Sequence, residues 1–378
     1  MSRRIVRPAV KIKQGNLIIF ATSFKVRDLI RDDFYNIDRL DPQNLENEGY
    51  QRLLNRNRAK KLADYIIAGQ DKQDAFLPTS IFMAIDKSIN FNENNNTIDF
   101  DLDNIGSFSV VDGQHRIEGL KMAAEKDERV LDFEIPVNIA VNLDNISQMA
   151  HFLIVNTTQK GVDEGLAQRI RERLTGMVDV EVLPSLPQWI ENMIKKQDDK
   201  NALRFVDYLN TAEDSPWQGK ITMANEVKKQ DAINQKSFVT LMKKHFLLHN
   251  NPLIYGDFSE DKQLKIFLNY WKAIINIIEP SKTSVLYKYN GVCLFCMFGV
   301  PFMSRLVNST DFTVKTMQKL LEDIFENASE EALGIGYEDF WRKGGKAGGF
   351  NATALNKICT NLVKTMSSLS MQGQEIEL

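Results

Sequence analysis

A short polar stretch between two apolar segments combines residue types that are common in binding and catalytic sites. Within VVDGQHRIEGL (110–120), these residues are Asp112, Gly113, Gln114, His115 and Arg116. A strand that turns at a glycine into a helix directs unpaired backbone N–H groups and the positive end of the helix dipole toward one small volume. Such an arrangement stabilises an anion, and a phosphate group above all.

Each residue of this stretch has a plausible role beside a phosphate. Gly113 allows the ligand to approach the backbone closely because it has no Cβ, and Arg116 can form bidentate contacts with phosphate oxygens. His115 is expected to donate a hydrogen bond to a phosphate or to shuttle a proton. Gln114 would be a neutral hydrogen-bonding partner, and Asp112 would bind a metal ion or orient His115.

The same residues also fit an ordinary strand–turn–helix with no ligand. In that alternative Asp112 caps the helix, His115 fills a surface niche, and Arg116 pairs with Asp112 or Glu118. We favour the functional interpretation because four functional residue types surround one glycine.

A basic cluster precedes this stretch by about fifty residues. GYQRLLNRNRAKK (49–61) contains no acidic residue, and its cations are Arg52, Arg56, Arg58, Lys60 and Lys61. One interpretation is a phosphate-facing surface, in which Arg52 binds a nucleotide while Arg56 and Lys60 contact a DNA backbone. The other is a solvated helix face, and the sequence favours the two about equally.

Two further segments carry candidate phosphate contacts. In FLIVNTTQKGVD (152–163), Asn156, Gln159 and Lys160 are expected to line a polar pocket, with a plain polar helix exit as the alternative. WRKGGKAGGFN (341–351) is expected to form a flexible basic loop for a phosphate or a DNA backbone. Its cations are Arg342, Lys343 and Lys346. The flanking Trp341 and Phe350 would anchor that loop or stack on a base.

Composition limits the class of protein. The chain has 378 residues, 43% of them hydrophobic, and a net charge of −3, which indicates a globular protein of about two domains. Any nucleic-acid contact must therefore come from a local basic surface. The longest apolar run, 291–303, is short for a membrane span, and no signal peptide is recognisable. We expect a cytoplasmic protein without a membrane partner, in which Cys293 and Cys296 are buried apolar residues.

Hydrophobic periodicity predicts an α/β (α+β) domain over 1–165 and a mainly helical domain over 166–378. The expected strands are 16–24, 76–85, 108–111 and 135–141, and a hairpin or surface insertion is expected over 85–104. The expected helices are 55–69, 117–126, 145–156, 237–249, 261–278, 313–327 and 352–369. Asn55 would cap the first helix and Gly69 would end it. The polar region 195–235 is expected to be a mobile connector.

Three motifs in this order resemble the DGQHR-domain family. They are GYQR…NRAKKLADYI, VDGQHRIEGL and FLIVNTTQKGV, and the likeness covers about residues 10–175. The family includes DndB-type proteins of DNA phosphorothioation systems and DpdB-type proteins of 7-deazaguanine systems. It is similar to the ParB/sulfiredoxin superfamily, which binds nucleotides on a strand–loop–helix. Gln114 stands where ParB has glutamate and sulfiredoxin has cysteine, which disfavours both of those chemistries.

The resemblance implies a purine nucleotide, ATP or another NTP with Mg²⁺, bound over Gly113–Arg116. Catalysis would be phosphoanhydride hydrolysis by an ATPase component of a DNA-modification or phage-defence system. In it, Asp112 or Glu118 would hold Mg²⁺ or orient water, and His115 and Arg116 would assist. The alternative is a DNA-binding transcriptional regulator without catalytic activity. A third possibility is a structural partner of the other modification proteins, and a homo-oligomer is compatible with all three.

Overall fold

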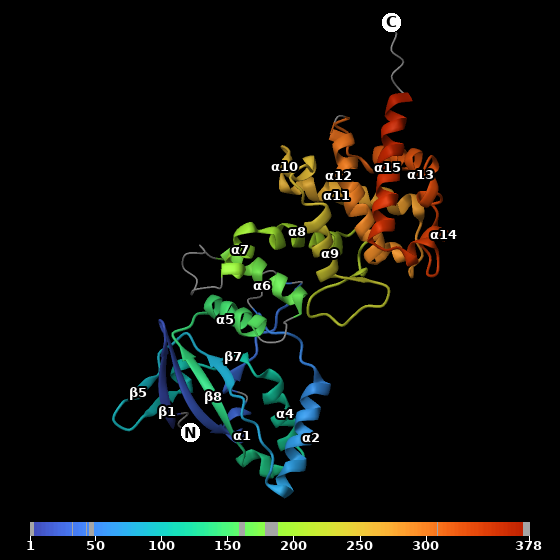
Figure 1. The fold of residues 1–378 in the computed structure, drawn as a ribbon. Coiled ribbons are helices and arrows are strands. Elements are labelled where there is room, and N and C mark those ends of the chain that lie inside the picture. Colours follow the sequence, from blue (N-terminus) through green and yellow to red (C-terminus); the bar gives the residue numbers. More distant parts are fainter. Residues whose placement is uncertain are drawn as a thin grey trace. The chain divides into compact units, whose positions relative to one another are not determined.

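The computed structural model describes residues 4–31, 33–42, 44, 49–158, 163–177, 188–307 and 309–372. The chain divides into two compact units (Figure 1). The first unit is Met1–Ile170 with Gly176–Glu191, and the second is Arg171–Thr175 with Asn192–Leu378. The expected combination of a mixed α/β N-terminal part and a helical C-terminal part is confirmed.

The first unit combines a large sheet with a few helices. Its strands are β1 (Arg4–Gln14), β2 (Leu17–Lys25), β3 (Tyr35–Asn36), β4 (Ile81–Ala84), β5 (Asn90–Asn92), β6 (Thr97–Asp101), β7 (Phe108–Asp112) and β8 (Glu134–Val141). Its helices are α1 (Val26–Leu29), α2 (Arg56–Lys72), α3 (Leu102–Ile105), α4 (Gln114–Ala124), the 3-10 turn η1 (Glu128–Asp132) and α5 (Asn145–Thr158). Helices α6 (Glu164–Met177) and α7 (Gln188–Lys196) cross the boundaries between the units.

The eight strands form one sheet in the order β3-β7-β4-β8-β2-β1-β6-β5. The pairs β3/β7 and β4/β8 are parallel, and the other neighbours are antiparallel. Strand β1 changes partner along its length, since Arg4–Pro8 pairs with β6 and Ala9–Gln14 pairs with β2. The expected hairpin over 85–104 is confirmed as β5 and β6.

Helices cover both faces of the sheet, and alternation along each strand decides which side chain faces which helix. One face packs against α2 and α4 in a core that includes Phe20, Met83, Val137, Ile66 and Leu120. Helix α5 lies on the other face, against β7 (Figure 1). The C-terminal end of β7 therefore opens beside the N-termini of α2 and α4.

Helix α2 begins where the sequence predicts. The Asn55 side chain accepts a hydrogen bond from the Arg58 N–H, which confirms Asn55 as the N-cap. The predicted end at Gly69 is wrong, because the helix continues to Lys72 and closes at Gln73 in the left-handed region. Gly69 serves close packing: a Cβ there would lie 2.6 Å from the Ala75 Cβ.

Helices α2 and α4 pack unusually closely at one point. A Cβ on Gly119 would lie 2.9 Å from the Ala59 carbonyl oxygen and 2.9 Å from a Leu62 methyl carbon. A glycine at this point lets the backbone of α4 approach α2. The start of α4 is thereby held next to the start of α2.

The second unit is a helical bundle. Its helices are α8 (Asp198–Thr211), α9 (Gln235–His245), α10 (Pro252–Tyr255), α11 (Glu260–Ile278), α12 (Tyr289–Val307), α13 (Val314–Glu326), α14 (Glu338–Trp341) and α15 (Ala352–Gln372). Short elements complete it, namely β9 (Ile221–Thr222), β10 (Ile233–Asn234) and the 3-10 turns η3 (Val285–Tyr287), η4 (Glu330–Ala332) and η5 (Lys346–Gly349). The four predicted helices correspond to α9, α11, α13 and α15.

The prediction of a mobile connector over 195–235 is wrong. Helix α8 and the parallel pair β9/β10 lie in this region. Trp217 is fully buried, and its ring lies 4.8 Å from that of Trp271. Buried Asp199 accepts charge-assisted hydrogen bonds from Arg171 and Lys243, each at 2.6 Å. The polar sequence of this region therefore includes residues that the second unit buries or pairs, such as Trp217 and Asp199.

Helix α12 is long and apolar enough to cross a membrane by length and composition alone. It nevertheless packs against α9 and α15 inside the second unit, and two thirds of its most apolar window is buried there. Cys293 and Cys296 lie on it, buried in this core, which confirms their apolar role. Helix α12 is therefore a core helix of the second unit.

Candidate anion-binding site

A pocket of about 350 Å³ lies at the C-terminal end of β7 in the first unit. The residues that line it are Arg52, Arg58, Leu62, Leu77, Thr79, Asp112, Gly113, His115 and Arg116. They come from the segment before α2, from α2 itself, from the segment before β4, and from the β7–α4 turn. The polar stretch and the basic cluster of the sequence therefore meet in one pocket.

Gly113 makes the turn from β7 into α4 possible. Its φ is +114°, which L side chains rarely adopt, and a Cβ there would lie 3.1 Å from two side-chain carbons of Ile81. Gly113 is also the N-cap of α4, and among the described residues no side chain caps this helix. The positive end of α4 is therefore available to an anion.

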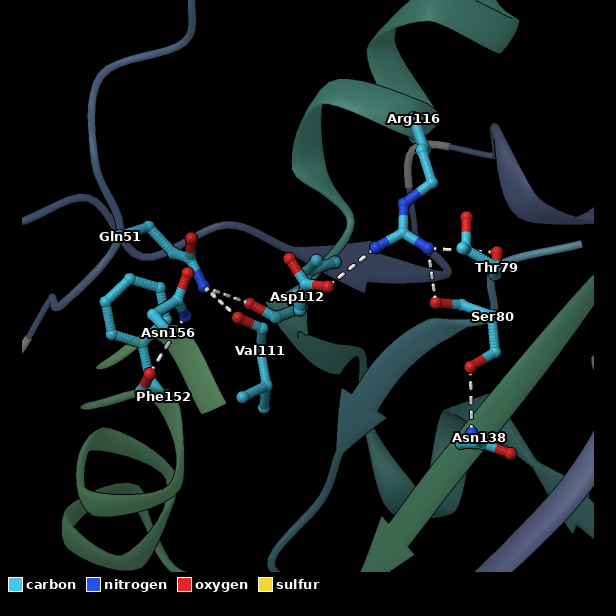
Figure 2. Close-up of polar contacts among 10 residues, drawn as sticks. Gln51, Thr79, Ser80, Val111, Asp112, Arg116, Asn138, Phe152 and Asn156 are labelled. Atoms are coloured by element: carbon cyan, nitrogen blue, oxygen red, sulfur yellow. Dashed lines mark hydrogen bonds and ion pairs between the residues drawn. The ribbon is translucent and has the colours of Figure 1, made fainter. Parts of the chain in front are cut away.

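Arg116 braces the walls of the pocket (Figure 2). Its Nη2 donates to Asp112 Oδ2 at 2.6 Å, and its Nη1 donates to the backbone carbonyls of Thr79 and Ser80. The Ser80 hydroxyl in turn accepts a hydrogen bond from Asn138 on β8. Of the roles considered for Arg116, the structure shows pairing with Asp112, whereas its contact with a phosphate stays a prediction.

Arg52 and Arg58 lie close to each other and carry charge that the pocket does not neutralise. In the part of the chain that the structure describes, no carboxylate lies within ion-pair distance of either guanidinium. Burial and the nearby Arg58 lower the pKa of Arg52, while Asp112 acts in the opposite direction. Since Asp112 already balances Arg116, Arg52 and Arg58 leave two unbalanced positive charges at the pocket.

His115 is held between the two helix starts. Its Nε2 accepts a hydrogen bond from the Asn55 backbone N–H at 3.0 Å. Burial, together with the positive charges of Arg52 and Arg58, lowers the pKa of His115 to about 4. The imidazole is therefore uncharged at neutral pH. The pocket thus presents guanidinium and N–H donors around a volume that suits an oxyanion.

Residues 7–173 match the DndB family model, described as DNA-sulfur modification-associated. The match contains every pocket residue and supports the expected relation to a DNA-modification family. It also supports involvement in a DNA sulfur modification system. Searches of curated proteins and of solved structures returned no match for this chain.

Several other predicted site residues within the DndB match lie outside the pocket lining. Glu118 is half-buried on α4 and is not among the lining residues. Gln114 is buried, and its Nε2 has no hydrogen-bond partner within the described ranges. The Asn156 amide donates back to the Phe152 carbonyl of its own helix (Figure 2). The predicted contacts Gln159 and Lys160 lie outside the described residues.

The predicted DNA contacts fall in two groups. Arg56 and Lys60 are exposed on α2, in the segment that matches DndB. The other predicted DNA contacts, Arg342, Lys343 and Lys346, lie in the second unit. Arg342 pairs with Asp339 at 3.2 Å, and Lys346 lies over the Phe340 ring.

The predicted basic loop of the second unit is fixed at both ends. Trp341 is fully buried and donates to the Ile335 carbonyl at 2.7 Å. The Phe350 ring lies 5.7 Å from that of Phe340. Trp341 therefore anchors the loop, and the alternative in which it stacks on a base is wrong.

The sequence predicted no pocket role for four of the lining residues, namely Arg58, Leu62, Leu77 and Thr79, although Arg58 was named in the basic cluster. A signal existed for Arg58 and Leu62, because they stand three and seven positions after the cap residue Asn55, on the helix face that carries the apolar residues. Leu77 and Thr79 follow the helix in an irregular segment. Their position depends on Arg116, which no local pattern reveals.

The uncharged state of His115 makes unfolding sensitive to pH. Because its pKa is lower in the folded protein than in the unfolded chain, the stability it contributes is complete above about pH 6.5 and is lost as pH falls toward 4. Comparing urea unfolding of wild type and His115→Gln over this range isolates the effect from the other histidines. We expect the free energy of unfolding to fall less in the variant than in wild type as the pH decreases from about 6.5 to 4. Parallel curves for the two proteins would contradict this prediction.

Proposed function

We propose that the pocket binds the phosphate groups of a nucleoside triphosphate, and that the protein is the nucleotide-binding component of a DNA sulfur modification system. The observation that carries this proposal is the pair of uncompensated guanidinium groups of Arg52 and Arg58 beside the uncapped start of α4. Holding two like charges close together, one of them on the half-buried Arg52, is unfavourable without a ligand. A phosphate chain supplies the missing negative charge and accepts bidentate hydrogen bonds.

The pocket also has features that suit the rest of a nucleotide. Its volume of about 350 Å³ lies within the usual range for small-molecule sites. Leu62 and Leu77 give its lining an apolar part, which suits a base or a ribose. The β7–Gly113–α4 turn is the kind of strand–loop–helix that the ParB/sulfiredoxin superfamily uses for nucleotides, and this likeness is part of the proposal.

A magnesium ion would find one protein ligand in this pocket. Asp112 is the only carboxylate among the described lining residues, and its Oδ1 accepts no hydrogen bond from the described part of the chain. Mg²⁺ in nucleotide sites is often held by one or two carboxylates together with the phosphates, so Asp112 fits this role. Glu118 does not line the pocket. Asp112 is also paired with Arg116, so the proposal places nucleotide binding ahead of hydrolysis.

Calorimetric titration tests the proposal directly. Wild-type protein is titrated with ATP, ADP, CTP and pyrophosphate, each with and without Mg²⁺, and phosphate release from ATP is measured in parallel. We expect ATP to bind and pyrophosphate to compete with it, since both place phosphates beside Arg52 and Arg58. No heat with any of these ligands at low salt would refute nucleotide binding. ATP binding without phosphate release would mean that the protein binds the nucleotide but does not hydrolyse it.

The exposed side of α2 favours DNA binding as a second candidate function. Arg56, Lys60 and Lys61 are exposed there, and none of them forms an ion pair within the described part of the molecule. The first turn of this helix contains no acidic residue. An unbalanced row of cations on a helix suits the phosphate backbone of duplex DNA. This surface would serve a DNA-binding regulator whether or not the pocket has catalytic activity.

Salt dependence measures how many phosphates this surface neutralises. Replacing both Arg56 and Lys60 with alanine is expected to weaken binding to duplex DNA and to lower the slope of log K against log salt by about 2. Fluorescence anisotropy gives the slope when it is measured between about 50 and 200 mM salt, a range over which DNA affinity depends strongly on salt. The control is Lys13→Ala/Lys87→Ala, which removes two exposed cations of the first unit that lie outside α2. Equal slopes for both variants would exclude α2 as the DNA surface.

A further inference from the structure

The segment that carries Arg52 is fixed at two points, one on each side of that residue. On one side, buried Gln51 donates from Nε2 to the backbone carbonyls of Val110 and Val111 on β7, the latter at 2.9 Å (Figure 2). On the other side, the Asn55 N–H donates to His115 Nε2 at 3.0 Å. The backbone from residue 51 to residue 55 is therefore tied to both the strand and the helix that form the phosphate-binding turn.

This second tie also sets the start of α2. Asn55 is the N-cap of that helix, and its side chain accepts a hydrogen bond from the Arg58 N–H. His115 thus holds the residue that precedes α2 by its backbone, and that residue holds Arg58 by its side chain. The backbone that carries Arg52 and the backbone N–H of Arg58 are therefore linked to the imidazole through Asn55.

We propose that His115 is a positioning residue, which clasps the backbone at Asn55 through Nε2 and keeps its own proton on Nδ1. This inference rests on the proposed function where it assigns phosphate binding to Arg52 and Arg58. The hydrogen bond between His115 and Asn55 does not depend on that function. Its consequence is that the ring is neither a general base nor a proton shuttle. Any ligand atom that meets Nδ1 must be a hydrogen-bond acceptor.

The hydrogen-bonding inventory of imidazole supports this assignment. A neutral ring has one N–H donor and one acceptor nitrogen, and the nitrogen that receives the Asn55 N–H must be the acceptor. A protonated ring would point an N–H at that same N–H and break the clasp. The charged groups that act on the ring are Arg52, Arg58 and Asp112, and the two arginines disfavour a second positive charge.

Nuclear magnetic resonance of protein labelled with ¹⁵N-histidine tests the clasp without any activity assay. The chain has four histidines, so the His115→Gln spectrum identifies the His115 signals. We expect the neutral Nδ1–H pattern, unchanged between pH 5.5 and 8, both alone and with pyrophosphate. A proton on Nε2, or a titration near pH 6.5, about the value for an unperturbed histidine, would overturn the proposal.

Two substitutions separate the clasp from general damage. In His115→Gln, the side-chain carbonyl can accept the Asn55 N–H and the amide can donate in place of Nδ1, so pyrophosphate affinity should stay within about threefold of wild type. His115→Phe keeps the ring shape but loses both contacts, and affinity should fall about tenfold. The control is His151→Phe on α5, a half-buried histidine outside the pocket. Equal losses for the glutamine and phenylalanine variants would overturn the proposal.

Amide hydrogen exchange at Asn55 reads the clasp even in the absence of a ligand. Exchange should be faster in His115→Phe than in wild type, and unchanged in His115→Gln and in Arg52→Ala. If pyrophosphate fails to bind wild type while this pattern holds, the proposed function falls and the clasp stands. If pyrophosphate binds but Asn55 exchanges at the same rate in all variants, the clasp is wrong and the function stands.

Discussion

Replacing both Arg52 and Arg58 with alanine is expected to weaken binding of ATP and pyrophosphate by at least about 100-fold. A hydrogen bond to a charged group contributes about 1.5–3 kcal/mol, so the loss of two such groups at one phosphate site exceeds a factor of 100. Each single substitution should have a smaller effect. Calorimetric titration with pyrophosphate gives the affinities of all three variants.

The matched control for this experiment is Arg56→Ala/Lys60→Ala. It removes the same net charge from the same helix region, but both residues are exposed and lie outside the pocket lining. Pyrophosphate affinity should stay within about twofold of wild type in this control, because neither side chain lines the pocket and exposed charges outside it are screened by salt. Equal losses in the two double variants would mean that binding responds to overall charge, and would exclude the pocket as the site.

The same Arg52/Arg58 variant should be at least as stable as wild type in the absence of a ligand. Burial and the charge of Arg58 both lower the pKa of Arg52, which shows that the folded structure disfavours this arginine in its charged form. Removing the pair relieves that cost. Residues that reduce stability yet are needed for binding are typical of functional sites.

Arg116→Ala is expected to lower the free energy of unfolding of the first unit by about 2–4 kcal/mol. Only 18% of the Arg116 side chain and 27% of the Asp112 side chain are exposed, so their ion pair is largely shielded from water. The substitution leaves Asp112 without its counter-charge, and the carbonyls of Thr79 and Ser80 without a donor. Differential scanning calorimetry should show the transition of the first unit several degrees lower.

A double substitution distinguishes a brace from a phosphate ligand. Asp112→Asn/Arg116→Met removes both charges together, and should recover much of the stability that Arg116→Ala loses, because no uncompensated charge remains. Should Arg116→Ala retain the stability of wild type and yet abolish pyrophosphate binding, Arg116 contacts the ligand directly. That outcome would restore the role that the sequence predicted for it.

Local signals in the sequence located much of the first unit correctly. The Asn55 cap and the strands at 16–24, 108–111 and 135–141 rest on capping and on short β-branched runs, which act over a few residues. The strand Arg4–Gln14 was not predicted. Its burial pattern explains this, because only Ala9 is fully buried along its length. A strand with both faces partly exposed gives little hydrophobic alternation.

The site could be predicted only in part, for a similar reason. Gly113, His115 and Arg52 were singled out, since glycine at a strand–helix turn and a cation cluster are visible in the sequence. The pairing of Arg116 with Thr79 and Ser80 was not, because it joins positions more than thirty residues apart. The region 195–235 shows the same limit, because the two cations that pair with Asp199, Arg171 and Lys243, both lie outside it in the sequence.

Helix α2 contributes Arg58 to the pocket while Arg56 and Lys60 face outward. On the two proposed functions, one helix would therefore serve two polyanionic ligands at once. A nucleotide in the pocket would reduce the positive potential that attracts DNA, and DNA on the outer side would reduce the attraction for the nucleotide. Thermodynamic reciprocity requires the two antagonistic effects to be equal in size, so occupancy of the pocket would report on, and set, release from DNA.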